Sequence, residues 1–414
     1  MSSPDFANLA RKSESAFTRN RGLPLPHLIL NLINFRKGTI ANELSQFSKA
    51  INGQDALPIV TPAAFCKARQ KLKHEVFVTL KDQAMEAFEA HFSTHRWHGH
   101  RLLAVDGSTG RLPNEAGLAK KFGGPSDATC PMVRFSRLYD VLNKVVVHAD
   151  MEPYDTGERE IAAKYLYEVN DQDLVLYDRG YAAFWLFAMH RDMNKTYCAR
   201  VKTTYSKEIK AFLESGKKSD IVLLKPNAKA LTQCNEYYIS EAPVRVRLVR
   251  VALGKGRTEV LVTSLLDEKA YPTYWFKKLY SLRWGVEENY KREKQRIEIE
   301  NFSGRSVEVI CQDFHAKILA LNLSAMVVWV AQAIAERVYK DRAKNYQINF
   351  ANAISVLKND LVSYINQRSP WGMLLRLLSE IIRSVEPVVP GRSYPRIFHK
   401  RVGSFFYGNY KRTQ

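Results

Sequence analysis

Apolar residues recur at helical spacing through the first part of the chain. The pattern predicts helices over residues 25–35 and 74–92, with a short basic helix over 65–72 between them. The basic segment carries Lys67, Arg69, Lys71 and Lys73. Cations on short helices are compatible with contact to a DNA duplex, although the solvated face of a helical bundle explains any one of them equally well. We expect residues 1–95 to form a helical, DNA-binding N-terminal region.

The pattern changes to buried strands alternating with helices after residue 101. Strands are predicted over 102–105, twice within 133–151, over 173–178 and over 196–202, with helices over 157–169 and 181–190. A hairpin followed by strand, helix, strand, helix and strand is typical of a mixed sheet with helices packed on it. The predicted fold class is therefore α/β.

A second strand-rich stretch follows, over residues 203–265. Its clearest strands are 244–253 and 258–266, joined by a Gly-Lys-Gly turn. After residue 271 the pattern is helical again. We expect a catalytic core over 96–205 and 266–340, a β-strand insertion over 206–265, and a helical C-terminal region over 341–414.

One uncharged segment, residues 318–335, approaches the length needed to cross a bilayer. Asn322, Ser324 and Gln332 interrupt it, and charged residues on both sides would continue the same helix. We favour a buried core helix over a membrane span, and we expect no membrane partner.

The net charge of the chain indicates the kind of partner that it binds. The chain has 414 residues, with 62 Lys and Arg against 42 Asp and Glu, and a formal net charge of +20. Such an excess favours a polyanion, with nucleic acid first. The five cysteines are scattered without a C-x-x-C spacing, and the N-terminus has no apolar stretch, so we expect a cytoplasmic location without zinc knuckle or disulfide framework.

Two carboxylates end apolar runs. Asp106 follows the run 102–105, and Asp178 follows 173–177. A carboxylate in such a place is costly to bury unless a cation or hydrogen bonds meet it, and strand ends open onto a common crevice where ligands gather. Each Asp taken alone fits a turn or helix cap equally well.

A more specific pattern lies on the helix predicted after residue 271. Tyr280, Arg283, Glu287 and Lys294 share an arc of about 60° on that helix. A glutamate flanked by two cations on one stripe can hold a divalent ion while the cations bind phosphates. Ordinary pairing of Arg with Glu on a surface helix explains the spacing equally well.

These residues resemble a known family. The segment 280–294 reproduces the signature Y-x2-R-x3-E-x6-K of transposases of the insertion-sequence-four family, a branch of the DDE transposases. The segment LLAVDGSTGRLP (102–113) resembles that family's first catalytic Asp strand, and LYDRGY (176–181) resembles its second Asp box. With IENFSGR at 299–305, the resemblance covers residues 101–305.

The resemblance implies a ribonuclease-H-like catalytic core in which Asp106, Asp178 and Glu287 form the DDE triad. It implies two Mg²⁺ ions, with Asp106 bridging them and Mn²⁺ able to substitute. Tyr280, Arg283 and Lys294 are then expected to contact DNA. Arg179 fits either a phosphate contact or a structural ion pair.

The function implied is cleavage at the ends of an insertion sequence, followed by attack of each 3′-OH on target DNA, in a homodimer assembled on terminal inverted repeats. Two alternatives remain open from the sequence: a DNA-binding repressor without turnover, and a domesticated ribonuclease-H-fold nuclease that does not transpose.

Two further sites are weaker. His91 and His95, with His98 and His100, could bind zinc if the segment were helical, but a helix end leading into a strand is the plainer interpretation. Trp275, Trp284 and Tyr290 could stack on an unpaired base, although aromatic residues at helical spacing more often pack in a core.

Overall fold

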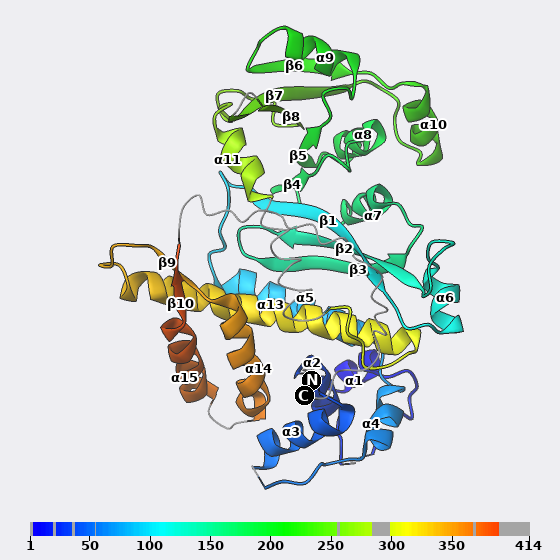
Figure 1. Ribbon diagram of the computed structural model, residues 1–414, viewed down its shortest axis with the longest axis vertical. Helices are drawn as coiled ribbons and strands as arrows, with labels where there is room; N and C mark the ends of the chain where they lie inside the picture. The colour runs from blue at the N-terminus through cyan, green and yellow to red at the C-terminus, as the bar shows by residue number, and fades with distance from the viewer. Residues whose placement is uncertain are drawn as a thin grey trace. The chain divides into compact units, whose positions relative to one another are not determined.

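The protein was analysed as a computed structural model, shown in Figure 1. The structure describes residues 3–19, 22–34, 38–53, 55–254, 257–283, 299–366 and 370–388. The chain folds into two compact units. The first comprises 1–92, 111–132 and 292–414, and the second comprises 93–110 and 133–291.

An eight-stranded mixed sheet dominates the second unit, in the order β3-β2-β1-β4-β5-β8-β7-β6. Strands β1, β4 and β5 run parallel, whereas β2 pairs antiparallel with β3, and β5 antiparallel with β8. The strands are β1 (Arg101–Arg111), β2 (Met132–Asp140), β3 (Val145–Pro153), β4 (Asp173–Tyr177), β5 (Thr196–Val201), β6 (Ser219–Leu224), β7 (Val244–Gly254) and β8 (Arg257–Thr263). This hairpin with adjoining parallel strands confirms the predicted α/β, ribonuclease-H-like fold class.

Helices α7 (Glu158–Tyr165) and α8 (Phe184–Asp192) share a core with one face of β1, β4 and β5. Leu103 and Val105 of β1 belong to this core, as do Val175 and Tyr177 of β4. Successive side chains of a strand point to opposite faces, so even-numbered positions of these two strands point away from α7 and α8.

The span 203–265 contains more helix than its pattern predicted. Helices α9 (Lys207–Glu214) and α10 (Ala228–Glu236) lie among strands β6 to β8. Each begins at a polar cap, where the Ser206 and Asn227 side chains accept bonds from the Ile209 and Ala230 amides. The predicted strands are present as β6 to β8, and the two helices among them were not predicted, because short capped helices leave little periodic signal beside the strong β7–β8 pattern.

The first unit is helical around one long helix, α13 (Val307–Val338). In Figure 1, α13 runs beside α5, and α14 and α15 lie against it. The other helices are α1 (Pro4–Ala10), α2 (Leu25–Asn34), α3 (Ile40–Asn52), α4 (Pro62–Arg69), α5 (Glu75–His91), α6 (Ala116–Phe122), α14 (Phe350–Asn366) and α15 (Pro370–Arg383). A short antiparallel pair, β9 (Tyr346–Ile348) with β10 (Val385–Pro387), joins them. The predicted N-terminal helices are confirmed in α2, α4 and α5.

Helix α13 contains the uncharged segment that approached membrane length. It is long and apolar enough to cross a bilayer, but 56% of its most apolar window is buried inside the protein. Gln312, Asp313, Asn322 and Ser324 are buried along it, and the Ser324 hydroxyl donates to the Ala320 carbonyl at 2.7 Å. The prediction of a core helix is confirmed by this packing. The four-part division of the chain is finer than the two units and stays a prediction.

Candidate active site

Asp106 and Asp178 lie at the same level on adjacent parallel strands. The β1–β4 register pairs Leu103 with Val175 and Ala104 with Leu176. Asp106 lies two residues after Ala104, and Asp178 lies two residues after Leu176. Both positions are on the face away from α7 and α8. Neighbouring strands are about 4.8 Å apart, so the backbones at these two partly buried residues lie one strand apart. The fold brings together the first two members of the predicted triad.

The turn after β4 orients Asp178. The Gly180 amide donates to Asp178 Oδ1 at 2.6 Å, and a Cβ at position 180 would lie 3.0 Å from that oxygen. The Arg159 Nε in turn donates to the Gly180 carbonyl at 2.8 Å. Arg159 is a residue that the sequence analysis missed, because its link to Asp178 exists only in the folded chain.

The next residue along β1 confirms the direction in which Asp106 points. A Cβ at Gly107 would lie 3.1 Å from Glu158 Oε1 on α7, so position 107 faces the helical side and Asp106 the opposite side. Glu158 is itself paired with Arg134 at 2.8 Å. Glu158 is therefore held by a cation on the α7 side and is not a third member of the carboxylate pair.

Tyr280, near the end of α11 (Trp275–Leu282), is buried with 4% of its surface exposed. Among the residues that the structure describes, none forms a hydrogen bond with its hydroxyl. Burial is the main cause that raises the pKa of Tyr280. The positive charges of Arg283 and Arg200 act to lower this pKa, and the negative charge of Asp178 acts to raise it. The hydroxyl therefore stays protonated at neutral pH and has no acceptor among the described residues.

The rest of the predicted signature is only partly described. Arg283 is 4% exposed, with its guanidinium carbon 5.8 Å from the centre of the Tyr280 ring. The contact of Arg283 with DNA stays a prediction. Glu287 and Lys294, with Trp284 and Tyr290, lie outside the described residues.

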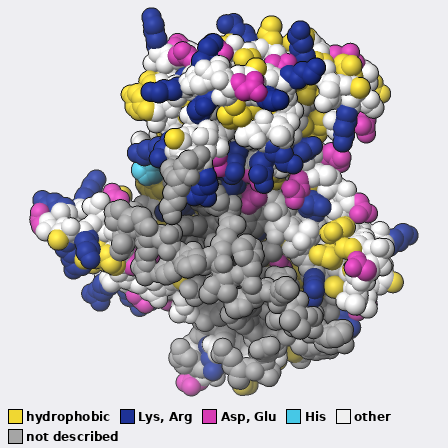
Figure 2. All heavy atoms as spheres, turned by 45° about the horizontal axis from the view of Figure 1, so that its top comes forward, with side chains coloured by type: hydrophobic (Ala, Val, Ile, Leu, Met, Phe, Trp, Pro, Cys, Tyr) yellow, Lys and Arg dark blue, Asp and Glu magenta, His cyan; other side chains and the backbone are white. Residues whose placement is uncertain are grey.

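A polar pocket of about 310 Å³ opens beside the carboxylates, where β5 ends and β8 begins. Arg179, the residue after Asp178, lines it together with Arg200 and Lys202. Glu259 is its carboxylate and pairs with Arg200 at 2.8 Å. On the face drawn in Figure 2, Lys and Arg side chains gather in a band. Arg179 lies on the wall of this pocket, and its contact with a phosphate stays a prediction.

Arg69 corrects one expectation about the basic helix 65–72. Its side chain is 2% exposed and binds Gln312 at 2.6 Å, Asp313 at 2.7 Å and the Ser303 hydroxyl. Arg69 therefore fixes α4 against α13 through these bonds. Its side chain cannot at the same time contact a DNA duplex. Its neighbours Lys67 and Lys71 are exposed. Sequence spacing did not distinguish them, because burial of a long cation depends on its distant partners.

The histidine-rich segment does not satisfy the helical condition for zinc. Helix α5 ends at His91, and Trp97 pairs with His100 in an isolated bridge. His98 instead stacks on Trp275, with ring centres 3.6 Å apart and planes 8° from parallel. Trp275 is partly exposed and packs against this ring, so it is not a buried core residue.

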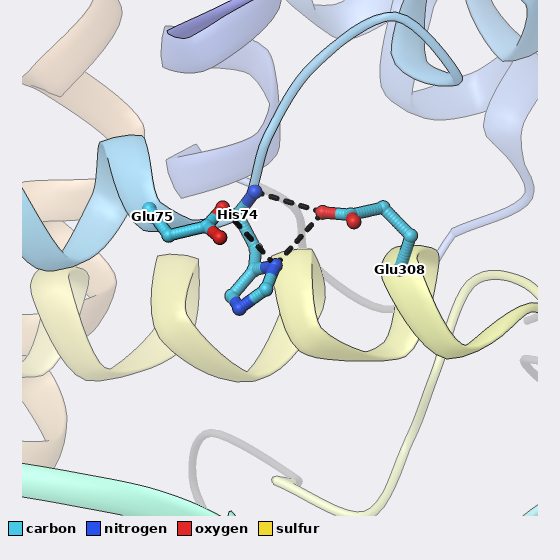
Figure 3. A group of neighbouring side chains, drawn as sticks. All are labelled: His74, Glu75 and Glu308. Carbon is cyan, nitrogen blue, oxygen red and sulfur yellow. Dashed lines mark hydrogen bonds and ion pairs between the residues drawn. The ribbon is translucent and has the colours of Figure 1, made fainter. Parts of the chain in front are cut away.

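A different cluster brings possible metal ligands together in the first unit, drawn in Figure 3. His74 Nδ1 lies 2.9 Å from Glu308 Oε1 and 3.4 Å from Glu75 Oε2. Lys12 Nζ also lies 3.2 Å from Glu308 Oε2. Burial would lower the pKa of His74, but the hydrogen bond to Glu308 and the charges of Glu308 and Glu75 together outweigh it and raise that pKa. With two cations already on Glu308, the cluster is an ion-pair network that joins the start of α5 to α13.

Among the described residues, Asp106 and Asp178 fit a divalent cation better than this network does. Hard cations such as Mg²⁺ prefer oxygen ligands, and two like carboxylates side by side repel each other unless a cation lies between them.

Comparison with known proteins agrees with this geometry. The transposase DDE domain family matches residues 97–323. Transposase InsG of insertion sequence element IS4 from Escherichia coli (strain K12) is 24% identical over 409 residues, covering 94% of this chain and 88% of InsG. The piggyBac transposase synaptic complex with hairpin DNA, a solved structure, aligns with 93% of this chain and 89% of its own at 10% identity and a TM-score of 0.37. The predicted resemblance is confirmed, and the chain belongs to the DDE transposases.

Proposed function

We propose that this transposase cuts DNA at the ends of its own insertion sequence and joins the freed 3′-OH ends to target DNA. The observation that carries the proposal is the alignment of Asp106 with Asp178 at one level of adjacent parallel strands. Glu287, the third proposed member of the triad, comes from the signature that begins at Tyr280.

Asp106, Asp178 and Glu287 would hold two Mg²⁺ ions, for which Mn²⁺ can substitute. Such ions, when bound, lower the pKa of an attacking water and neutralise charge on the phosphoryl group. In the first step a water oxygen bonds to phosphorus and the 3′ oxygen of the element leaves. In the second step that 3′-OH attacks a target phosphodiester, so one bond forms for each bond broken and no redox partner is needed.

The side chains around the carboxylates have distinct roles. The Gly180 amide donates to one oxygen of Asp178, and Arg159 donates to the Gly180 carbonyl. We propose that the second oxygen of Asp178 faces a ligand. Tyr280 keeps a buried proton that it can donate to a phosphate oxygen. Arg179 and Lys294 are proposed to bind flanking phosphates. Because two ends must be joined together, we propose a homodimer assembled on the terminal inverted repeats, acting in the cytoplasm.

The test uses purified full-length protein with Mg²⁺ or Mn²⁺ and a duplex that carries the inverted repeat flanking this gene. We expect nicking at the repeat end and joining to a second plasmid. Asp106→Asn, Asp178→Asn and Glu287→Gln should abolish both while DNA binding persists. Asp171→Asn is a matched control, since that exposed carboxylate pairs with Lys195 at 2.8 Å.

The outcomes separate the competing functions. Binding without nicking by the wild type would favour a repressor, and nicking without joining would favour a nuclease. Unchanged cleavage by the Asp106 and Asp178 variants would refute the proposed triad.

A further inference from the structure

The pocket beside the carboxylates is built to hold an anion. Arg179, Arg200 and Lys202 bring three cations to it, against the single carboxylate of Glu259. Thr203 and Thr258 add hydroxyl donors. A volume of about 310 Å³ lies at the small end of the range of ligand pockets, which is about 300–1,000 Å³. Its charge and size suit a sugar-phosphate unit.

The strand register ties this pocket to the two aspartates. Tyr177 of β4 pairs with Ala199 of β5, so Asp178 and Arg200 are level on neighbouring strands. Val201 pairs with Val260 across β5 and β8, which places Lys202 beside Glu259 one position further on. Asp106, Asp178 and Arg200 therefore follow one another across β1, β4 and β5.

An ion pair fixes the Arg200 side chain in this row. Its guanidinium meets Glu259 at 2.8 Å, and the side chains are 28% and 11% exposed. The pair leaves Lys202 and Arg179 exposed at the pocket. A partly buried guanidinium fixed by one carboxylate can still donate to a phosphate with its remaining N–H groups.

We propose that Arg200, Lys202 and Thr203 form a phosphate subsite for the DNA strand being cut, with Arg200 as its positioning residue. The inference rests on the proposed function. One strand spacing is about 4.8 Å and a duplex strand rises about 3.4 Å per nucleotide, so the subsite binds a phosphate about one to three nucleotides from the cleaved bond. Fixing that phosphate aligns the bond to be cut with Asp106 and Asp178.

The experiment maps the phosphate contact by neutralising one phosphate at a time. A short duplex ending in the flanking inverted repeat is made with a single methylphosphonate at each position near the end. Binding is measured by fluorescence anisotropy without divalent metal, so that no cleavage occurs. For the wild type we expect about a tenfold loss of affinity at one position near the cleavage point, the scale of a lost charge-assisted hydrogen bond.

Arg200→Ala should bind the unmodified duplex more weakly and should lose its sensitivity at that one position, while other positions behave as in the wild type. Lys202→Ala, an exposed change that does not threaten folding, should reduce the slope of log K against log salt by about 0.9. Lys229→Ala is the matched control, because Lys229 is an exposed α10 lysine outside the pocket, and it should keep the wild-type sensitivity profile.

If Arg200→Ala keeps the wild-type methylphosphonate profile and Lys202→Ala keeps the wild-type salt slope, the subsite does not exist. If Arg200→Ala does not fold, the salt slope of Lys202→Ala decides alone. Failure of the wild type to cleave with Mg²⁺ would count against the proposed function, and the metal-free binding profile would still decide the subsite.

Discussion

The two units use buried carboxylates in opposite ways. In the helical unit, Asp313 is 4% exposed, contacts Arg69 at 2.7 Å and accepts the Ser303 amide at 2.6 Å. Burial would raise the pKa of Asp313, but the charges of Arg69 and Lys317 together with the Ser303 hydrogen bonds outweigh it and lower that pKa. In the sheet unit, Asp178 accepts a bond from the neutral Gly180 amide and has a second carboxylate, Asp106, at its level.

The difference separates stability from function. A carboxylate neutralised inside the protein holds elements together, and nothing is gained by adding an ion there. Two carboxylates aligned beside each other repel, and a divalent cation bound between them would relieve that cost. A substitution at the first kind of site should therefore lower stability, and one at the second kind should lower cleavage activity. Four predictions test this difference.

The largest expected effect is on catalysis. Asp178→Asn keeps the shape of the side chain and its bond from Gly180 but removes the charge that would bind a cation. End cleavage should fall by about 10³-fold or more, the scale of losing a group on which the chemical step depends. The melting temperature should be unchanged or slightly higher, because the repulsion between this side chain and Asp106 is reduced. A variant that loses stability as well as activity would assign Asp178 a structural role.

The next effect is on folding. Arg69→Met leaves Asp313 buried without its cation, which should cost about 3–5 kcal/mol of unfolding free energy in urea denaturation. Cleavage per folded molecule should stay near the wild-type value, and Lys67→Met, which removes an exposed cation of the same helix, should cost little. Equal losses from the two variants would contradict the buried network.

A smaller effect is expected from Tyr280→Phe, which removes one hydroxyl and keeps the ring under Arg283. If that hydroxyl donates to a phosphate oxygen, the cleavage rate should drop about tenfold or somewhat more. Stability should not fall, because no described residue bonds to the hydroxyl. Single-turnover cleavage and a thermal melt of the same sample separate these effects. A wild-type cleavage rate in the variant would remove Tyr280 from the site.

The smallest effect concerns pH and the cluster in Figure 3. The raised pKa of His74 stabilises the fold below about 6.5, and this contribution is lost as pH rises through the folded-state value. Burial would raise the pKa of Glu308, but the His74 bond and Lys12 lower it to about 2, so its contribution is present above 4.5 and lost as pH falls toward 2.

His74→Ala should therefore cost most between pH 4.5 and 6.5, by about 1 kcal/mol for this partly exposed pair. The measurement is the difference in melting temperature between the wild type and the variant across pH. A constant difference from pH 5 to 9 would show that His74 acts by packing alone.

Much of the fold was predictable because its signals are local. The strands β1 and β4, the hairpin of β2 and β3, and the helices α2 and α5 all follow from periodicity close in sequence, although β1 continues past Asp106 to Arg111 instead of ending before it. The helices α9 and α10 were missed because each is only two turns long. Arg69 was misjudged because its partners Ser303, Gln312 and Asp313 are more than 230 residues away.

The sequence by itself determined the chemistry available to this protein: the family signature, the basic charge, and carboxylates at the ends of apolar runs. Only the tertiary structure decided which charges meet. It placed Asp106 level with Asp178, set Arg200 one strand further along, buried Arg69 against Asp313, and left the Tyr280 hydroxyl without a described partner. The reason is that a motif fixes residue types along the chain, whereas burial and pairing depend on strand register and on helices that are distant in sequence.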